Sequence, residues 1–347
     1  MVTVRGSRGG FVTAADVARR AGVSRSAVSR AFTPGASVSA EMRERVVRAA
    51  DDLGYRVNRL ASSLNHARSN LVGLVVTDLQ QPFHAGLLAA LSARLLADGF
   101  QCMLLNAANA GHDIAAVIAR VLEYRVAAIV VMTGTPPARI VEECLRNGVP
   151  VILVNKLLPK LAVDTVLADH AEGGRLAAEC LLGAGCRRLA VVSSAARTTS
   201  LVRRIEAFVA CAGESRVTVR IWQERPTTDY QTGREAALAL LAKERIDGVF
   251  CVTDLLALGF LDAARFECGR QVPADLCVIG FDDIPQAAWS AYRLTTFRQP
   301  LDDLAAAVMT AIRRREPRSE ARHRLATVPV KLVPRSTVRG LSAAEVS

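Results

Sequence analysis

The sequence predicts a multidomain protein, in which an all-α helix-turn-helix headpiece precedes an α/β core of two doubly wound, parallel-sheet lobes. Near the N-terminus, two short apolar stripes at helical spacing are bounded by capping residues. From residue 71 onward, apolar strands alternate with amphipathic helices. At 347 residues, 51% of them hydrophobic, the chain exceeds one ordinary core and is long enough for two or three domains.

Residues 12–32 predict two short helices joined by a tight turn. Thr13 followed by Asp16 is a variant of the capping box and opens the first helix. Gly22 ends it, because glycine adopts positive φ at little cost, and Ser24 then caps the second helix. The apolar faces that pack together are expected to consist of Val17, Ala18, Ala21, Ala27, Val28 and Ala31.

The outer face of the second helix is polar and basic. Arg25, Ser26, Ser29 and Arg30 lie near its N-terminus, where a recognition helix meets base edges in the major groove. A surface hairpin with solvated arginines is the alternative. Residues 1–70 hold 12 Arg against 5 acidic residues, whereas the other 277 hold 32 basic against 28 acidic, so the excess positive charge accompanies this motif. The chain has forty Arg and four Lys. An Arg-favouring genome also produces such a ratio, so the uneven charge supports DNA binding but the choice of Arg does not.

A third helix follows, capped by Ser39, with Glu41 and Glu44 near its positive end. Gly54 ends it and Tyr55 closes the small core, and the residues expected to turn inward are Val46, Val47, Ala50 and Leu53. Residues 56–70 are polar and too short to bury a face. They predict a linker, or a helix that forms only on DNA.

The core alternates strands and helices, which predicts parallel sheets covered on both faces. Helices are expected between the strands, for example over 86–98 and 173–184. Nine strands exceed one usual open sheet, so two lobes are expected, with a ligand in the cleft between them. The expected strands are residues 71–76, 102–105, 127–132, 149–154, 165–168, 189–192, 217–222, 248–252 and 276–281.

Cysteine usage and hydropathy predict a cytoplasmic protein that is neither secreted nor membrane-bound. No apolar stretch approaches the roughly 18 residues that span a bilayer, and no apolar segment follows the first arginines. The cysteines show no C-x-x-C spacing and predict free, buried thiols. They are Cys102, Cys144, Cys180, Cys186, Cys211, Cys251, Cys268 and Cys277.

The motifs of common enzyme classes are missing from the sequence. No G-x-G-x-x-G follows the first strand, no G-x-S-x-G is present, and the five histidines are scattered. We therefore expect no enzymatic activity, no cofactor and no metal site. A transport-type sugar-binding protein would need a signal peptide, which the basic start of the chain does not provide.

Several further short sequence segments follow one another along the chain. They are Leu53-Gly54-Tyr55 followed by Asn58, Ala61 and Leu64; Val72-Gly73-Leu74-Val75-Val76; Cys251-Val252-Thr253-Asp254-Leu255-Leu256-Ala257-Leu258-Gly259; Val278-Ile279-Gly280-Phe281-Asp282-Asp283; Leu294-Thr295-Thr296-Phe297-Arg298-Gln299-Pro300; and Arg335-Ser336-Thr337. With the helix-turn-helix, they make the chain resemble the lactose/galactose repressor (LacI/GalR) family of bacterial transcription regulators over residues 12–337.

The resemblance implies a headpiece, a hinge helix and a periplasmic-binding-protein-like core that the chain crosses three times. It implies that Arg25, Ser26 and Arg30 contact bases and that Thr13, Ser24, Ser29 and Ser39 contact phosphates. It also assigns Asn58, Ala61 and Leu64 to the hinge, with Leu64 as a wedge in the minor groove. The alternative for Leu64 is a seal between headpiece and core.

This chain departs from the family pattern at several positions. Most members have Pro at the position of Val57 and Asn at that of Thr253. A common effector-binding Arg position is Val202 here, with arginines beside it, and Met132 replaces a residue that is polar in some members. The family's sugar-binding arginine is therefore not carried over to a residue of this chain.

By position, the cleft is expected to be lined by Phe83, His84, Asn155, Arg204, Thr253, Asp254 and Asp282. An acid, amides and an aromatic wall suit a polyhydroxylated or amide-bearing small molecule. Three alternatives stay open at this point. For Asp282 the alternative is a strand-end carboxylate that caps the next segment. For His84 it is a packing or surface residue, and for Arg204 it is a pairing with Glu206 or another carboxylate.

Together these inferences predict a ligand-responsive, sequence-specific regulator, most simply a repressor. It binds a pseudopalindromic operator as a homodimer, lies on the nucleoid when bound, and takes a sugar or related metabolite between its lobes. A constitutive DNA-binding protein without an effector is the alternative.

The expected parts are a headpiece (1–57), a hinge (58–69), a core (70–340) and a tail (341–347). Within the core, lobe 1 is expected at about 70–168 and 300–328, and lobe 2 at about 169–297 and 329–340. The tail has no heptad repeat, so no leucine-zipper tetramer is expected.

Overall fold

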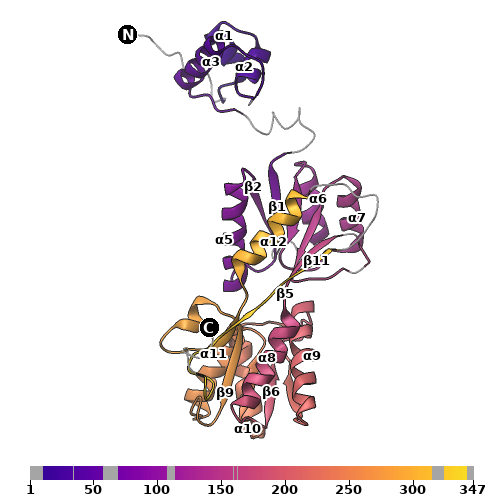
Figure 1. Ribbon diagram of the computed structural model, residues 1–347, viewed down its shortest axis with the longest axis vertical. Helices are drawn as coiled ribbons and strands as arrows, with labels where there is room; N and C mark the ends of the chain where they lie inside the picture. The colour runs from indigo at the N-terminus through magenta and orange to yellow at the C-terminus, as the bar shows by residue number, and fades with distance from the viewer. Residues whose placement is uncertain are drawn as a thin grey trace. The chain divides into compact units, whose positions relative to one another are not determined.

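The computed structural model describes residues 11–33, 35–57, 69–107, 114–158, 160–161, 163–314 and 324–341. The chain forms two units, Met1–Ser69 and Asn70–Ser347 (Figure 1). The described part of the first unit is helical, and the second contains two α/β lobes. None of the helices in the described segments has the length and apolar character needed to cross a membrane.

The first unit is a small helical domain made of α1 (Ala14–Ala21), α2 (Arg25–Ala31) and α3 (Ala40–Leu53). The expected capping box is present, since Thr13 Oγ1 accepts from the Asp16 amide (3.4 Å) and the Asp16 carboxylate accepts from the Thr13 amide (3.0 Å). Gly22 ends α1 at φ 66°. Ser24 and Ser39 cap α2 and α3 through bonds from Ala27 N and Met42 N, each 3.2 Å.

The core of this domain differs from the expected one at Val47. The buried cluster consists of Val17, Ala18, Val28, Ala31, Val46, Ala49 and Ala50, with Tyr55 packed against it. Val47 is 39% exposed, so its predicted inward position is wrong. The inward stripe of α3 runs through residues 46, 49, 50 and 53, at the spacing that one helix face requires, and residue 47 lies off that face.

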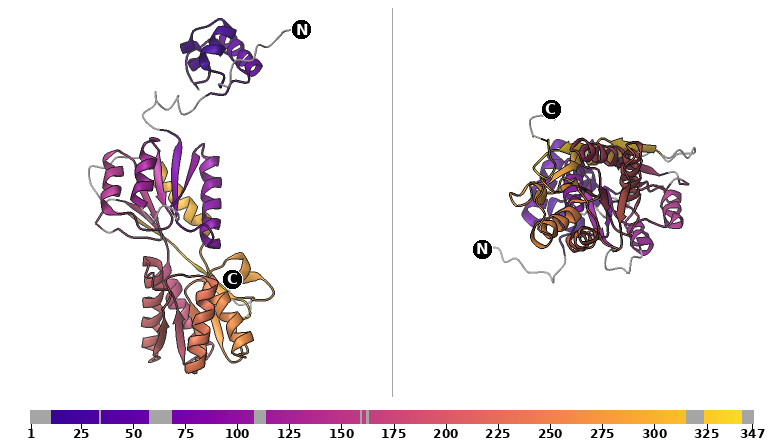
Figure 2. Two further views of the ribbon diagram at one scale, coloured as in Figure 1. Left: turned by 180° about the vertical axis from the view of Figure 1, so that it is seen from behind. Right: turned by 90° about the horizontal axis from the view of Figure 1, so that it is seen from below.

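The second unit contains two six-stranded sheets, one in each lobe (Figures 1 and 2). The first has the order β11 (Arg324–Val328), β5 (Asp164–Ala168), β4 (Val151–Val154), β3 (Ala128–Val131), β1 (Leu71–Val76), β2 (Gln101–Asn106), and all its pairs are parallel. The second has the order β12 (Lys331–Val333), β10 (Thr295–Arg298), β9 (Cys277–Asp282), β8 (Gly248–Cys251), β6 (Leu189–Val192), β7 (Val219–Trp222).

Helices cover both faces of each sheet (Figures 1 and 2). In the first lobe α5 (Pro82–Ala97) packs against α12 (Leu301–Arg313), and α6 (Ile114–Leu122) packs against α7 (Ala138–Arg146). In the second, α8 (His170–Gly183) packs against α9 (Thr199–Glu214), and α10 (Tyr230–Lys243) against α11 (Asp254–Asp262). A π-helical turn, η1 (Ala263–Glu267), and a 3₁₀ turn, η2 (Pro285–Ala288), complete the second lobe.

The nine expected strands are all present within a few residues, and the predicted fold class is confirmed. Three strands were not expected: β10, β11 and β12. Among them β12 runs antiparallel to β10, so the second sheet is not purely parallel.

The chain passes between the lobes three times, from β5 to α8, from β10 to α12 and from β11 to β12. All eight cysteines lie in described segments and are free. Cys102, Cys180 and Cys268 are partly exposed, and the other five are buried.

Candidate functional site

The outer face of α2 is a cationic surface. The side chains of Arg25, Ser26, Ser29 and Arg30 are exposed, whereas Ala27 and Val28 are buried against the other two helices. Among the described residues, neither the Arg25 nor the Arg30 guanidinium has a hydrogen-bond or ion-pair partner. Other headpiece arginines are engaged within the domain: Arg19 pairs with Asp16 (3.1 Å), and Arg20 with Asp52 (3.2 Å).

Three of the four exposed hydroxyl residues expected at phosphates lie at helix N-termini, and the fourth, Ser29, lies within α2. Thr13, Ser24 and Ser39 are the N-caps of α1, α2 and α3. Ser24 Oγ also lies 2.9 Å from Ser26 Oγ, and the Ser29 carbonyl accepts from Thr33 Oγ1 (2.8 Å). The expected hinge residues Asn58, Ala61 and Leu64 lie outside the described residues.

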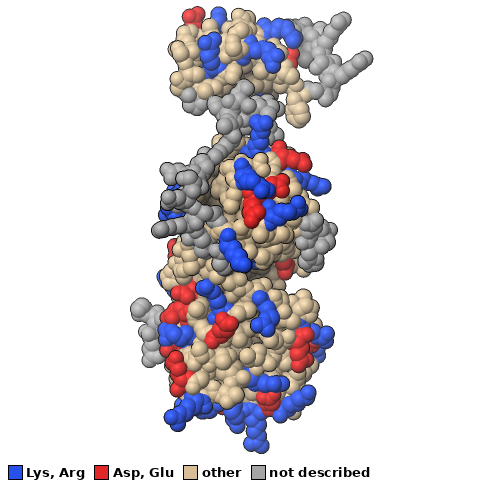
Figure 3. Space-filling model, turned by 90° about the vertical axis from the view of Figure 1, so that its right-hand side faces the viewer, with Lys and Arg blue, Asp and Glu red and all other residues tan. Residues whose placement is uncertain are grey.

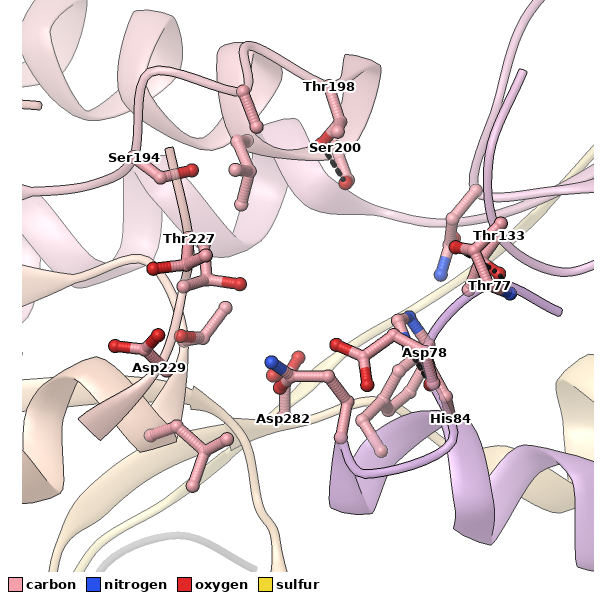
Figure 4. Close-up of a pocket in the computed structure, with 18 of the residues that line it drawn as sticks. Thr77, Asp78, His84, Thr133, Ser194, Thr198, Ser200, Thr227, Asp229 and Asp282 are labelled. Atoms are coloured by element: carbon pink, nitrogen blue, oxygen red, sulfur yellow. Dashed lines mark hydrogen bonds between the residues drawn. The ribbon is translucent and has the colours of Figure 1, made fainter. Parts of the chain in front are cut away.

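A cavity of about 690 Å³ lies between the two lobes of the core. Its walls are formed where strands of both sheets end, the position at which open α/β sheets bind ligands. Figure 4 shows Thr77, Asp78, His84 and Thr133 on one side and Ser194, Thr198, Ser200, Thr227 and Asp229 on the other, with Asp282 between them. Acidic and basic side chains are interspersed over the face of the core in Figure 3.

Six of the seven residues expected at the cleft line this cavity: Phe83, His84, Asn155, Arg204, Thr253 and Asp282. The seventh, Asp254, does not line it. Asp254 is fully buried, where its carboxylate accepts from the Ile284 amide (2.9 Å) and from Thr296 Oγ1 (2.5 Å). Its bonds hold β10 and the loop after β9, so the expectation that Asp254 lines the cleft is wrong.

The cavity-lining residues Asn155, Arg204, Asp282 and Gln299 belong to a closed ring of hydrogen bonds with His170. Asn155 Nδ2 donates to Gln299 Oε1 (3.1 Å), and Gln299 Nε2 donates to Asp282 Oδ1 (2.6 Å). Arg204 Nη2 donates to the same Asp282 oxygen (3.5 Å), while Arg204 Nε donates to His170 Nδ1 (3.3 Å). His170 Nε2 lies 2.9 Å from Asn155 Oδ1 and closes the ring. The ring joins the first lobe, through Asn155, to the second.

The ring determines the protonation of its members. His170 is neutral with its proton on Nε2, because Nδ1 must accept from Arg204 and Nε2 must donate to the Asn155 oxygen. Burial and the neighbouring Arg204 hold the pKa of His170 well below its usual value. Burial raises the pKa of Asp282, and the Arg204 guanidinium opposes that rise. Arg204 also lies 3.5 Å above the Phe281 ring, which favours its charged form.

The alternative left open for Arg204, a pairing with a carboxylate other than Glu206, is present in the structure. Arg204 pairs with Asp282 and is only 3% exposed. Its guanidinium also donates to the Val252 carbonyl. Val202, the position of a common effector-binding arginine in the family, does not line the cavity. Asn155 (φ 56°) and Asp282 (φ 119°) both have positive φ, a strained backbone for residues other than glycine.

Two buried hydroxyls of the second lobe, Ser194 Oγ and Thr253 Oγ1, line the cavity without a partner among the described residues. An unsatisfied buried hydroxyl costs free energy that a polar ligand can offset. These groups are therefore available for a bound molecule.

Several cavity residues were missed by the sequence reasoning. Thr77, Thr133, Lys156 and Ser194 directly follow expected strands or lie one residue further on, so the rule that ligands meet strand ends could have found them. Gln299 and His170 carried no such signal. Gln299 follows a strand that was not expected, and His170 lies outside the cavity lining and acts through its neighbours.

Comparison with known proteins agrees with this two-part structure. Residues 13–58 match the family model "Bacterial regulatory proteins, lacI family", and residues 178–338 match the model "Periplasmic binding protein-like domain". The HTH-type transcriptional regulator GalS of Salmonella typhimurium is 32% identical over 299 residues, which cover 85% of this chain and 87% of GalS. The chain belongs to the LacI family of bacterial regulatory proteins.

Solved LacI-family structures share the fold. The lac repressor dimer bound to operator and the anti-inducer ONPF superposes with a TM-score of 0.83 at 24% identity, covering 94% of this chain and 99% of that one. The complex of the regulator CelR with cellobiose gives 0.66 at 26% identity, covering 94% and 99%. The predicted family and fold are thereby confirmed, and this LacI-family member is a DNA-binding transcriptional regulator.

Proposed function

We propose that this protein is a repressor that binds a pseudopalindromic operator as a homodimer and is controlled by a small polar metabolite bound between its lobes. The observation that carries the proposal is the outer face of α2. It presents Arg25 and Arg30 exposed and without partners, on a helix whose buried face fixes their direction. A guanidinium left unpaired at a helix surface is available for bidentate bonding to guanine.

In this proposal Arg25, Ser26 and Arg30 contact base edges, whereas Thr13, Ser24, Ser29 and Ser39 contact phosphates. The exposed N-terminal caps favour the second role, because the positive end of a helix attracts an anion. The two sets have different consequences. Base contacts select sequence, and phosphate contacts add affinity for any sequence.

The cavity supports control by a ligand. Its unpartnered hydroxyls, Ser194 and Thr253, and the amide and carboxylate of Asn155 and Asp282 suit a polyhydroxylated compound. The CelR relative binds cellobiose, a molecule of this kind. A ligand shifts operator affinity only by its different affinities for the two states of the dimer, typically about 1–3 kcal/mol, and the sign of that shift is not fixed by the pocket.

The test is selection of bound sequences from a random DNA library by the full-length protein and by Arg25→Ala. We expect the wild type to select a pseudopalindrome and Arg25→Ala to lose discrimination at one position in each half-site, worth about 1–3 kcal/mol. Arg48→Ala is the matched control, because it removes an exposed positive charge from α3 instead of α2. It should retain the wild-type motif. An unchanged motif for Arg25→Ala would show that another face contacts the bases.

A further inference from the structure

One charged side chain in the wall of the cavity has no partner. Lys156 follows β4 directly after Asn155, and its side chain lines the cavity from the first lobe. No hydrogen bond or ion pair joins Lys156 to any residue in the described part of the chain. An ammonium ion can donate three hydrogen bonds and accept none, so its requirement is for acceptors, above all anionic ones.

The other charged groups that line the cavity are already engaged. Asp282 accepts from Gln299 and Arg204, and Arg204 is held within the ring described above. Asp229 accepts from the Thr232 amide (2.8 Å) at the start of α10, and Asp78 accepts from the Gln80 amide (3.0 Å). These amide bonds satisfy acceptor sites of Asp78 and Asp229 without cancelling their charge, whereas Lys156 is the cavity-lining cation that no acceptor in the described chain engages.

The surroundings of Lys156 do not neutralise it. Burial lowers the pKa of Lys156 to about 8, and burial is the single cause of that shift. The neighbouring His84 offers no negative charge, because an imidazole is either neutral or cationic. Burial lowers the pKa of His84, and the contact of its Nδ1 with the Asp78 carbonyl (3.1 Å) opposes that shift. Thr133 and Thr77 line the same wall and bond to each other through their hydroxyls (2.9 Å). Hydroxyls and an ammonium ion together are typical partners of a carboxylate or phosphate oxygen.

We propose that the effector is an anionic polyol, whose carboxylate or phosphate group binds the Lys156 ammonium while its hydroxyls contact Ser194 and Thr253 on the opposite wall. This deepens the proposed function and rests on it, because it names the chemical class of ligand for the same cavity. A sugar acid and a sugar phosphate share this chemistry. Both carry the negative charge that Lys156 requires and that a neutral sugar such as cellobiose lacks.

The experiment is isothermal titration of the full-length protein with matched probes: glucose, galactose and ribose, then gluconate, glucuronate, galacturonate, glucose 6-phosphate and ribose 5-phosphate. We expect at least one acid or phosphate to bind and its neutral counterpart to bind more weakly. Lys156→Met should weaken the anionic probe about 10- to 100-fold, and Lys156→Arg should retain most of the affinity. Whether the carboxylates or the phosphates bind distinguishes the two sources of charge.

Lys160→Met is the matched control, because Lys160 lies four residues away, is exposed and does not line the cavity. It should bind every probe as the wild type does, and thermal unfolding of each variant verifies folding. The inference is overturned if no anionic probe binds at millimolar concentration, or if Lys156→Met binds the anionic probe unchanged. Binding of a neutral sugar that Asp282→Ala abolishes and Lys156→Met does not would overturn the inference alone and leave the proposed function standing.

Discussion

Lys156 has no partner among the residues that the structure describes, so burial of its ammonium ion costs the folded core free energy at neutral pH. The pKa of Lys156 is about 8 in the folded chain and near its ordinary value of 10.5 when unfolded. Below pH 8 Lys156 is protonated in both the folded and the unfolded chain, and the folded chain bears the full free-energy cost of burying the charge. Between about pH 8 and 10.5 the unfolded state binds more protons, so this residue's contribution to the free energy of unfolding rises with pH.

We therefore expect Lys156→Met to raise the free energy of unfolding by about 1–3 kcal/mol at pH 7, and the gain to vanish as the pH approaches 10.5. Urea unfolding of the variant and of Lys160→Met at pH 7 and pH 10 measures the difference. A gain that is equal at both pH values, or equal in the exposed control, would contradict the uncompensated burial of the charge. A gain that is present at pH 7 and fades by pH 10 would be consistent with a stability cost retained for binding.

At the same scale, six of the seven residues that the sequence placed at the cleft do line the cavity, but their hydrogen bonds to one another were not predicted. Asn155 and Asp282 were found because polar groups at strand ends meet at one edge of a sheet, whereas Arg204 lies in α9 and was expected by its position in the chain. Asp254 was misplaced by the same rule, since it also follows a strand, yet its carboxylate turns into the core toward Thr296. The direction in which a strand-end side chain points depends on backbone torsions that the residue type alone does not determine.

At the scale of elements, helices α10 and α11 approach each other most closely at two glycines. A Cβ on Gly259 would overlap the Tyr230 carbonyl oxygen and lie 2.9 Å from the Arg234 nitrogen. A Cβ on Gly233 would likewise overlap the Leu256 carbonyl oxygen. Because backbone cannot move aside as a flexible side chain does, neither position accepts a larger residue without separating the helices.

Gly259→Ala should therefore lower the free energy of unfolding of the core by about 1–3 kcal/mol or more. Gly213→Ala in α9 is the matched control. Nothing lies within 4 Å of its Cβ, so the helix gains up to about 1 kcal/mol from the better helix former. Chemical denaturation of both variants checks the opposite signs. Equal effects would mean that helix propensity, and not the close approach, governs Gly259.

The elements that the sequence revealed are those with continuous apolar runs, such as β1, β3 and β6. The strands that it did not reveal have weaker patterns: β11 is largely exposed at a sheet edge, and β12 has three residues. Their positions depend on pairing with segments far away in the chain, β5 and β10. Local periodicity does not contain that information.

At the scale of the whole molecule, the second lobe exposes large apolar side chains. Phe266 is 81% exposed on η1 and Trp289 is 54% exposed after η2. Arg265 Nη1 bonds the Ala291 carbonyl (2.7 Å), which brings η1 and the segment that contains Trp289 together. Exposed aromatic residues on two such connected segments are the ones that we expect at the contact surface of the proposed homodimer.

We expect sedimentation equilibrium to give a dimer at micromolar concentration and Phe266→Asp to shift it toward monomer, because a charge in an apolar interface loses its hydration. Tyr124→Asp, which alters an exposed aromatic residue of the other lobe, is the control and should stay dimeric. A wild-type monomer or tetramer, or an unaltered Phe266→Asp dimer, would refute this assignment.

The three passages of the chain between the lobes also set the order in which a ribosome can complete each part. The headpiece core closes by Tyr55, so that domain has all its residues as soon as they leave the exit tunnel. The first lobe must wait: its helix α12 and its strand β11 are translated only after β10 of the second lobe. Until residue 313 emerges, α5 lacks the neighbour that covers it. During synthesis, this protein therefore has a finished headpiece attached to a core whose first-made lobe is among the last parts to be finished.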